Sequence, residues 1–255
     1  MSLTTTAPAG AQSRYYDHAL DAQFRLDAPG EVPEHVRAAV TGWLHWVDNT
    51  FSMTRPDSLL SQVRRHAITL ADCPQDVLDL IALCSDLTCE TAGYFSIVSG
   101  GVLDPSGVAK GWATHYASRL LTAAGCRQHC LRGGRDIWAA GEAGPGRPWR
   151  LVISHPMASG TLAAIVTARD CAVATSVGAR RHVVDPTTDR PVTDLASVTV
   201  VGPDLVRADA YATAAIAMGR NATDWLAGLD RYGALVVGRE GRVWQSANWH
   251  DLTTG

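Results

Sequence analysis

Two oxygen-bearing side chains lie one helical turn apart in the segment RADAYATAAIAMG, near the end of the chain. Asp209 and Thr213 are four residues apart, so on a helix the carboxylate and the hydroxyl share one face. Magnesium prefers hard oxygen ligands in an octahedral array that water and substrate phosphate usually complete. The pair could supply part of such an array. Alternatively, Asp209 favours the helix dipole and Thr213 packs among the alanines.

The segment LDPSGVAKGWATHYASRLLTAAG, residues 103–125, predicts a helix that could hold an anion. Ser106 fits its N-cap, and a glycine follows the last apolar residue. The apolar residues recur every four positions, at Val108, Trp112, Tyr116, Leu120 and Ala124. The expected first turn carries Lys110 and Gly111, where free N–H groups and the helix dipole favour a phosphate. Alternatively, Asp104 and Ser106 only cap a core helix and Lys110 points into water.

Three other places in the sequence have a polar side chain or a pair of glycines at or near an expected turn. His182 lies in RRHVVDPTTDRP, where an imidazole could act as a general base near neutral pH or could be an ordinary turn residue. Thr175 and Ser176 end an expected strand. Gly133 and Gly134 either let backbone approach a ligand closely or simply form a turn.

The composition excludes several classes of protein. With 255 residues, 46% of them hydrophobic and 18% charged, the chain can bury a sizeable core. A formal net charge of −3 and a pI near 6.3 provide no basic surface, which argues against a nucleic-acid partner. The six cysteines include no CxxC pair, so we expect reduced thiols and not a zinc site.

Neither a signal peptide nor a membrane span is expected. The first residues lack a basic start and an apolar run, and no later stretch approaches the roughly 18 apolar residues of a membrane helix. We therefore expect a cytoplasmic protein with a disordered tail over residues 1–13 and a single domain over residues 14–255.

Periodicity and turn signals predict an α+β fold with a largely antiparallel sheet. The expected helices, beside the one at 106–124, cover residues 32–49, 58–65, 75–88, 206–218 and 222–229. The expected strands cover residues 94–98, 149–154, 161–167, 172–175 and 196–201, and a hairpin joins 234–238 to 242–246. We expect the four strands between 149 and 201 to share one sheet.

The order of these motifs resembles the FAD:protein FMN transferase (ApbE) family from Thr50 onward. FSMTRPDSLLS is similar to the family segment S-x-x-R-x-D-S-x-(I/L)-S, and TCETAGYFS to T-x-G-x-F-D. LDPSGVAKGWA is similar to D-(L)-x-x-(I/V)-A-K-G-(Y/W)-A, and PWRLVISHP to W-x-(I/V)-x-I-x-x-P. ATS, HVVDP and ADAYATAAIAMG then follow in the family's order.

The resemblance implies a T-fold-like α+β domain that binds FAD and Mg²⁺. It also implies transfer of the FMN half of FAD to a threonine or serine of a target flavoprotein, with release of AMP. The implied magnesium ligands are Asp209, Thr213 and the carbonyl of Gly107, and the implied base is His182. The implied FAD contacts are Gly93, Tyr94, Phe95, Asp104, Lys110, Thr175 and Ser176, with Lys110 near the pyrophosphate.

The chain departs from the family pattern mainly at the expected isoalloxazine end. TSVGARRH is short, lacks a tyrosine and has Arg181 in place of the first of two histidines. GGRD is out of step with the family's G-G-D, HALDAQFRL replaces an M-G-T segment, and Ser96 replaces the aspartate of F-D. Two alternatives to transfer therefore stay open: an FAD pyrophosphatase that releases FMN and AMP, or a non-enzymatic flavin-binding protein.

Overall fold

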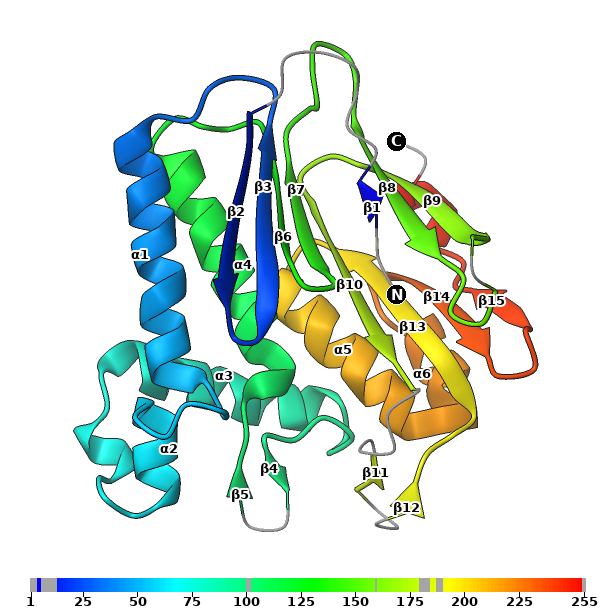
Figure 1. Cartoon of the computed structure of the whole chain (residues 1–255). Coiled ribbons are helices and arrows are strands. Elements are labelled where there is room, and N and C mark those ends of the chain that lie inside the picture. Colours follow the sequence, from blue (N-terminus) through cyan, green and yellow to red (C-terminus); the bar gives the residue numbers. More distant parts are fainter. Residues whose placement is uncertain are drawn as a thin grey trace.

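The centre of the fold is an eight-stranded sheet in which every pair of neighbouring strands is antiparallel (Figure 1). The structure, a computed structural model, describes residues 4–5, 13–99, 102–158, 160–178, 184–186 and 190–253. The sheet order is β15-β14-β13-β10-β7-β6-β3-β2. The strands are β2 (Ser13–Ala19), β3 (Ala22–Ala28), β6 (His129–Gly133), β7 (Asp136–Ala140), β10 (Cys171–Val177), β13 (Leu195–Gly202), β14 (Gly233–Gly238) and β15 (Val243–Gln245).

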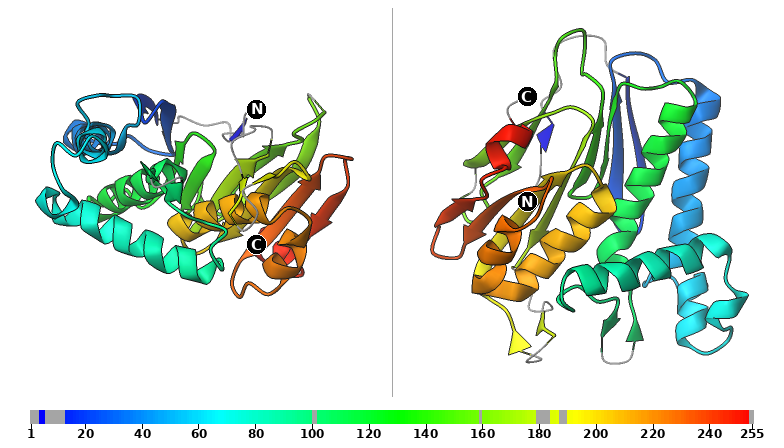
Figure 2. Two further views of the ribbon diagram at one scale, coloured as in Figure 1. Left: turned by 90° about the horizontal axis from the view of Figure 1, so that it is seen from below. Right: turned by 180° about the vertical axis from the view of Figure 1, so that it is seen from behind.

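Most helices lie on one side of this sheet, and a smaller sheet together with the last helix covers part of the other face (Figure 2). The helices are α1 (Glu34–Phe51), α2 (Leu59–Arg64), α3 (Gln75–Glu90), α4 (Ser106–Ala123), α5 (Leu205–Met218), α6 (Ala222–Ala227) and α7 (Trp249–Thr253). Two 3₁₀ turns occur at Leu70–Asp72 and Gly219–Asn221. The smaller sheet contains β1 (Thr4–Thr5), β8 (Trp149–Ser154) and β9 (Leu162–Ala168).

Central strands are apolar on both faces because both faces are covered. In β13, Val198 and Val200 belong to the core under the helices, whereas Val201 belongs to the core under the smaller sheet. In β10, Ala174 likewise belongs to the core under the helices and Val173 to the core under the smaller sheet. Successive side chains of a strand point to opposite faces, so a covered strand reads as a continuous apolar run.

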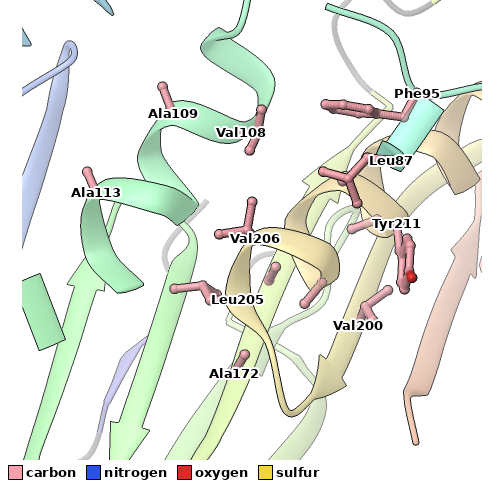
Figure 3. Close-up of a cluster of buried hydrophobic side chains, with 14 of the residues drawn as sticks. Leu87, Phe95, Val108, Ala109, Ala113, Ala172, Val200, Leu205, Val206 and Tyr211 are labelled. Atoms are coloured by element: carbon pink, nitrogen blue, oxygen red, sulfur yellow. The ribbon is translucent and has the colours of Figure 1, made fainter. Parts of the chain in front are cut away.

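Helices α4 and α5 pack closely because a glycine lies at their contact. A Cβ on Gly111 of α4 would lie 3.4 Å from the Leu205 carbonyl of α5, and the side chain of Val108 points toward Val206 (Figure 3). The side chain of Asp204 caps α5 by accepting a 2.8 Å hydrogen bond from the Arg207 N–H. The close approach of the two helices brings their polar residues to one place.

Most predicted elements are confirmed, including the α+β class, the five other helices and the terminal hairpin. The prediction that the four strands from 149 to 201 share one sheet is wrong, because β8 pairs with β9 and β1 in a separate sheet. The strand expected at 94–98 is also wrong. Only Val98 is in a strand, β4 (Val98–Ser99), which pairs with β5 (Val102–Leu103), while the N–H groups of Tyr94 and Phe95 bond to Thr91.

The expected apolar stripe of α4 is rotated in the structure. Alanines and Val108 are buried, whereas Trp112 and Tyr116 are half-buried at the boundary with α1. The ring of Trp43 in α1 stacks on Tyr116 with centroids 4.3 Å apart, and its Nε1 donates to the Ala113 carbonyl at 3.0 Å. Bulky rings fit at the edge of the helix pair, because only small residues allow close approach in its middle.

The predicted N-terminal tail differs partly from the structure. Thr4–Thr5 form β1 against β8, and Ser13 already belongs to β2. The remaining residues of the tail, 1–3 and 6–12, lie outside the described residues. Among the helices that are described, none combines the length and the apolar content needed to cross a membrane.

Candidate functional site

Asp209 lies in the middle of α5 with its side chain against α4. The residue is 6% exposed, and a Cβ placed on Gly111 of α4 would lie 3.0 Å from the Asp209 Oδ2. Burial, and then the charge of Asp136, raise the pKa of Asp209 well above its usual range. Lys110 and the backbone N–H of Gly111 act in the opposite direction by favouring the carboxylate. Nearby positive groups therefore balance only part of the negative charge that Asp209 would carry.

Hydroxyl groups lie one turn further along the same helix. Thr213 Oγ1 is 3.0 Å from the Ser176 Oγ at the end of β10, and both residues are only partly buried. Thr175 is buried, and its Oγ1 lies 2.9 Å from the Thr199 Oγ1. The end of β10 and the face of α5 thus bring together Asp209, Thr213 and Ser176, and α5 carries the first two on one face as their spacing predicted.

Lys110 reaches the site from α4. Its Nζ donates to the Ser106 carbonyl at 3.1 Å, and it lowers the pKa of both Asp136 and Asp209 through its charge. Lys110 is the only lysine in the 255 residues, a signal that was available in the sequence and was missed. The expected position of Lys110 and Gly111 in the first turn is wrong: α4 begins at Ser106, so both lie in the second turn.

Asp104 has the capping role that the sequence left as an alternative. Its Oδ1 accepts a 2.9 Å hydrogen bond from the Ser106 N–H, while Pro105 and not Ser106 stands at the N-cap position. Gly107, the implied carbonyl ligand, lies in the first turn of α4, four residues before Gly111. Asp104 and Lys110 therefore both lie near the start of α4, and Asp104 already uses one oxygen to order it.

Asp136 is a site residue that the sequence reasoning missed. It begins β7 and is 3% exposed. It pairs with Gly133 at the end of β6 across a hairpin turn at Gly134 and Arg135, which we call the Gly-Gly turn. Burial raises the pKa of Asp136 to about 6, against the lowering effect of Lys110 and Arg135. The carboxylate next to a Gly-Gly turn could have been recognised, but its distance from Asp209 in the sequence hid the electrostatic interaction between the two residues.

The Gly-Gly turn is held close to α4. A Cβ on Gly133 would overlap Thr114 Oγ1 and the ring of Phe24, so glycine is needed for this approach. The Arg135 Nε donates to the Thr175 carbonyl at 3.3 Å, which ties the turn to the end of β10. The turn thereby carries Asp136 into the region between α4, α5 and β10.

The segment implied to line the flavin follows α3. Gly93 has a φ of +85° and Tyr94 is partly buried. Phe95 is 2% exposed and belongs to the core, and a Cβ on Gly107 would lie 3.8 Å from its Cε2 (Figure 3). Phe95 therefore supports the first turn of α4, while Gly93 and Tyr94 retain exposed surface.

A polar clamp joins the end of α3 to α5. The Tyr211 Oη donates to Glu90 Oε2 at 2.6 Å, and Arg207 forms a 3.0 Å ion pair with Glu90 Oε1. Both α5 residues lie two positions from Asp209. The clamp holds α5 from the side opposite α4 and links it to the Gly93–Phe95 segment.

His182 lies outside the described residues, together with Arg180 and Arg181. Its role as base therefore stays a prediction. Val184–Asp185, which follow it, form β11 and pair with Arg190–Pro191 in β12.

The donor set at this site fits magnesium better than a transition metal. Among the described residues, no group of three or more His, Cys, Asp or Glu side chains could hold a metal ion. The site instead offers carboxylate and hydroxyl oxygens from Asp209, Thr213 and Ser176. Magnesium binds through few protein oxygens, with water and substrate phosphate completing its coordination. The raised pKa of Asp209 also indicates that a cation would stabilise its charged form.

Comparison with known proteins identifies the family of this chain. The ApbE family model matches residues 99–236, which contain α4, the Gly-Gly turn, the end of β10 and α5. The FAD:protein FMN transferase of Klebsiella pneumoniae is 28% identical over 168 residues, which are 60% of this chain and 48% of that protein. The FAD:protein FMN transferase of Rhodobacter capsulatus is 35% identical over 133 residues, 48% of this chain and 25% of that protein.

Solved structures show the same fold. The flavin transferase ApbE of Vibrio cholerae superposes with a TM-score of 0.80 at 20% identity, covering 95% of this chain and 99% of that one. The ApbE protein of Thermotoga maritima gives a TM-score of 0.82 at 18% identity, with the same coverage. The fold is therefore that of the flavin transferases.

The chain belongs to the ApbE family. It spans about half the length, or less, of the relatives that it matches in sequence.

Proposed function

We propose that the chain transfers the FMN half of FAD to a threonine or serine hydroxyl of a target flavoprotein. In this reaction the hydroxyl oxygen bonds to the FMN phosphorus, the bond from that phosphorus to the bridging oxygen breaks, and AMP leaves. The observation that carries the proposal is the buried Asp209 carboxylate, which faces Gly111 and has Thr213 and Lys110 beside it. The same residues match the family's motifs.

Some of the site residues would bind the metal ion, and others would contact the phosphates. Asp209, Thr213 and the Gly107 carbonyl would hold Mg²⁺, which when bound would neutralise negative charge on the pyrophosphate. Lys110 would place its ammonium near the same phosphates, next to the start of α4. The charge of Asp136 raises the pKa of Asp209, so a cation bound beside Asp209 would favour its charged form. These roles are consistent with oxygen-rich phosphate chemistry and use no thiol.

The flavin and the acceptor would be handled by other residues. Gly93, Tyr94 and Phe95, with Thr175 and Ser176 at the end of β10, would border the FAD site. His182 would take the proton from the acceptor hydroxyl as its oxygen bonds to phosphorus. Lys110 and Arg135 would then face the negative charge that remains on AMP.

The decisive experiment combines the chain with FAD, MgCl₂ and the purified protein substrate of the Klebsiella pneumoniae FAD:protein FMN transferase. Intact mass of that substrate, together with analysis for AMP, should show a gain of one FMN with an equal amount of AMP. Free FMN and AMP with an unmodified acceptor would instead indicate a pyrophosphatase. Bound flavin without either product would indicate a binding protein.

A further inference from the structure

A cleft of about 880 Å³ lies between the residues around α2 and the β4–β5 hairpin. Figure 1 shows α2 and this hairpin at the same end of the molecule as the start of α4. We call it the α2 cleft. It is lined by Met53, Thr54, Pro56, Ser61, Val63, Arg64, Arg65, His66, Ile68, Thr69, Leu70, Val98, Val102 and Leu103.

One side of the α2 cleft is positively charged. Arg64, Arg65 and His66 are consecutive, exposed and part of its lining, whereas no lining residue is acidic. The Arg65 Nη1 donates to the Pro56 carbonyl at 2.6 Å, and the Arg64 Nη1 lies 3.8 Å from the Met53 sulfur. Neither contact neutralises the charge, and none of the three forms an ion pair with another described residue. The cleft therefore attracts negative charge.

The other side is apolar and exposed. Val98 is 54% exposed and Val102 is 40% exposed, although both are large hydrophobic residues. They come from a hairpin in which β4 and β5 pair only with each other, within the described residues. Val98 pairs with Leu103 across the hairpin, so these two apolar side chains share one face. An apolar face beside a free strand edge suits an extended polypeptide, which can present apolar and acidic side chains to the two walls.

The cleft adjoins the proposed reaction site without containing it. Leu103 lines the cleft, and the next residue, Asp104, orders the start of α4. None of the residues proposed to contact FAD or Mg²⁺ belongs to the lining. A segment bound in the cleft would therefore lie next to the flavin phosphate, where the acceptor hydroxyl has to arrive.

We propose that the α2 cleft docks an acidic, extended segment of the protein that receives FMN. The inference rests on the proposed function for the identity of the partner, but the cleft's preference for an acidic peptide does not. Arg64 and Arg65 provide electrostatic attraction, and Val98 with its cross-strand partner Leu103 provides apolar contact. Opposite charges of this kind mainly increase the association rate and set the specificity of binding.

The first test measures peptide binding without any flavin chemistry. A fluorescein-labelled peptide of alternating aspartate and valine is titrated with the protein, and fluorescence anisotropy reports binding. A second peptide has lysine in place of each aspartate. We expect the acidic peptide to bind at least ~10-fold more tightly, with affinity that falls as NaCl increases. Equal affinity for the two peptides would overturn the proposal.

Charge reversal then locates the binding. The double variant Arg64→Glu/Arg65→Glu should lose the preference for the acidic peptide. The matched control is Arg150→Glu/Arg242→Glu, which makes the same change in net charge on exposed residues outside the cleft. Val98→Asp should weaken the same peptide through the apolar wall. If the control loses as much affinity as Arg64→Glu/Arg65→Glu, overall charge and not the cleft determines binding.

The last measurement separates the cleft from the flavin site. In calorimetric titrations, FAD should bind Arg64→Glu/Arg65→Glu as tightly as the parent, while the KM for the acceptor protein rises ~10-fold or more and kcat changes little. Weaker FAD binding would assign the cleft to the flavin and would overturn the proposal. A parent that binds the acidic peptide but transfers no FMN would reject the proposed function and leave the docking preference standing.

Discussion

Gly111 of α4 faces Asp209 of α5 so closely that a Cβ on Gly111 would lie 3.0 Å from the Asp209 Oδ2 and 3.2 Å from its Cβ. The same Cβ would lie 3.4 Å from the Leu205 carbonyl. The absent side chain is therefore what lets α4 and α5 meet at the candidate metal ligand. Two neighbouring residues of α4 therefore shape the surroundings of Asp209: Lys110 through its charge and Gly111 through its small size.

Gly111→Ala should displace Asp209 and lower magnesium-dependent transfer ~10-fold or more, because small misplacements of catalytic groups are costly. The same overpacking should destabilise the protein by about 1–3 kcal/mol. Steady-state kinetics and urea unfolding would measure the two effects. Gly42→Ala in α1 is the control, since a Cβ there meets nothing within 4 Å. Full activity of the Gly111 variant would show that Asp209 needs no exact placement.

Asp209→Asn should abolish the effect of magnesium while the protein stays folded. The amide keeps the shape but removes the charge, and with it the repulsion from Asp136. We expect MgCl₂ to raise the Tm of the parent and leave that of the variant unchanged, with transfer reduced roughly 10²-fold. CaCl₂ should substitute poorly, because calcium favours longer bonds and more ligands. An equal magnesium-induced Tm shift in both proteins would place the metal elsewhere.

Lys110→Ala should weaken FAD binding by about 10-fold and change riboflavin binding much less, because the ammonium would meet the pyrophosphate and not the ring. Isothermal titration calorimetry with the two ligands tests this difference. Since Lys110 is the only lysine, an amine-reactive reagent provides a second measurement. FAD should protect Lys110 from modification. Equal losses for both ligands, or no protection, would separate Lys110 from the phosphates.

His182→Asn should leave FAD affinity within a few-fold of the parent and reduce transfer by about 10² or more, the usual contribution of a positioned general base. Intact mass of the acceptor measures the transfer, and calorimetry measures FAD binding. A variant that transfers FMN as fast as the parent would show that another group takes the acceptor proton.

His129 should make the stability of the fold depend on pH. Its Nε2 lies 2.7 Å from the Ser118 Oγ and its Nδ1 lies 2.7 Å from the Cys126 carbonyl, and burial lowers its pKa to about 4. The unfolded chain, with a histidine pKa near 6.5, binds the proton first. Stability from this group is therefore complete above about pH 6.5 and is lost as the pH falls toward 4.

We expect the parent to be about 2 kcal/mol less stable at pH 5 than at pH 7 through His129. Urea unfolding at the two pH values measures the difference. His129→Gln should be less stable than the parent at pH 7 but should lose less stability on acidification. The same pH difference in both proteins would assign the effect to other groups.

Local patterns determined a large part of this protein. The spacing of Asp209 and Thr213 placed both on one face of a helix, because four residues are about one helical turn wherever the helix packs. Apolar periodicity and breakers likewise predicted α1, α3 and the β14–β15 hairpin. The ordered motifs identified the family. All of these signals depend on neighbours within a few residues, so the sequence carries them directly.

Tertiary structure decided which of these elements meet. Asp136 joins Asp209 only because β7 and α5 pack together, and sequence separation contains no record of that contact. The same holds for β8 and β9, whose apolar pattern fits either sheet, although they pair with each other outside the main sheet. On α4, Gly111 and not the neighbouring Trp112 faces α5, because even a Cβ there would lie 3.0 Å from the Asp209 Oδ2. Pairing and packing are contacts between distant segments, so they set the site that local sequence could only partly predict.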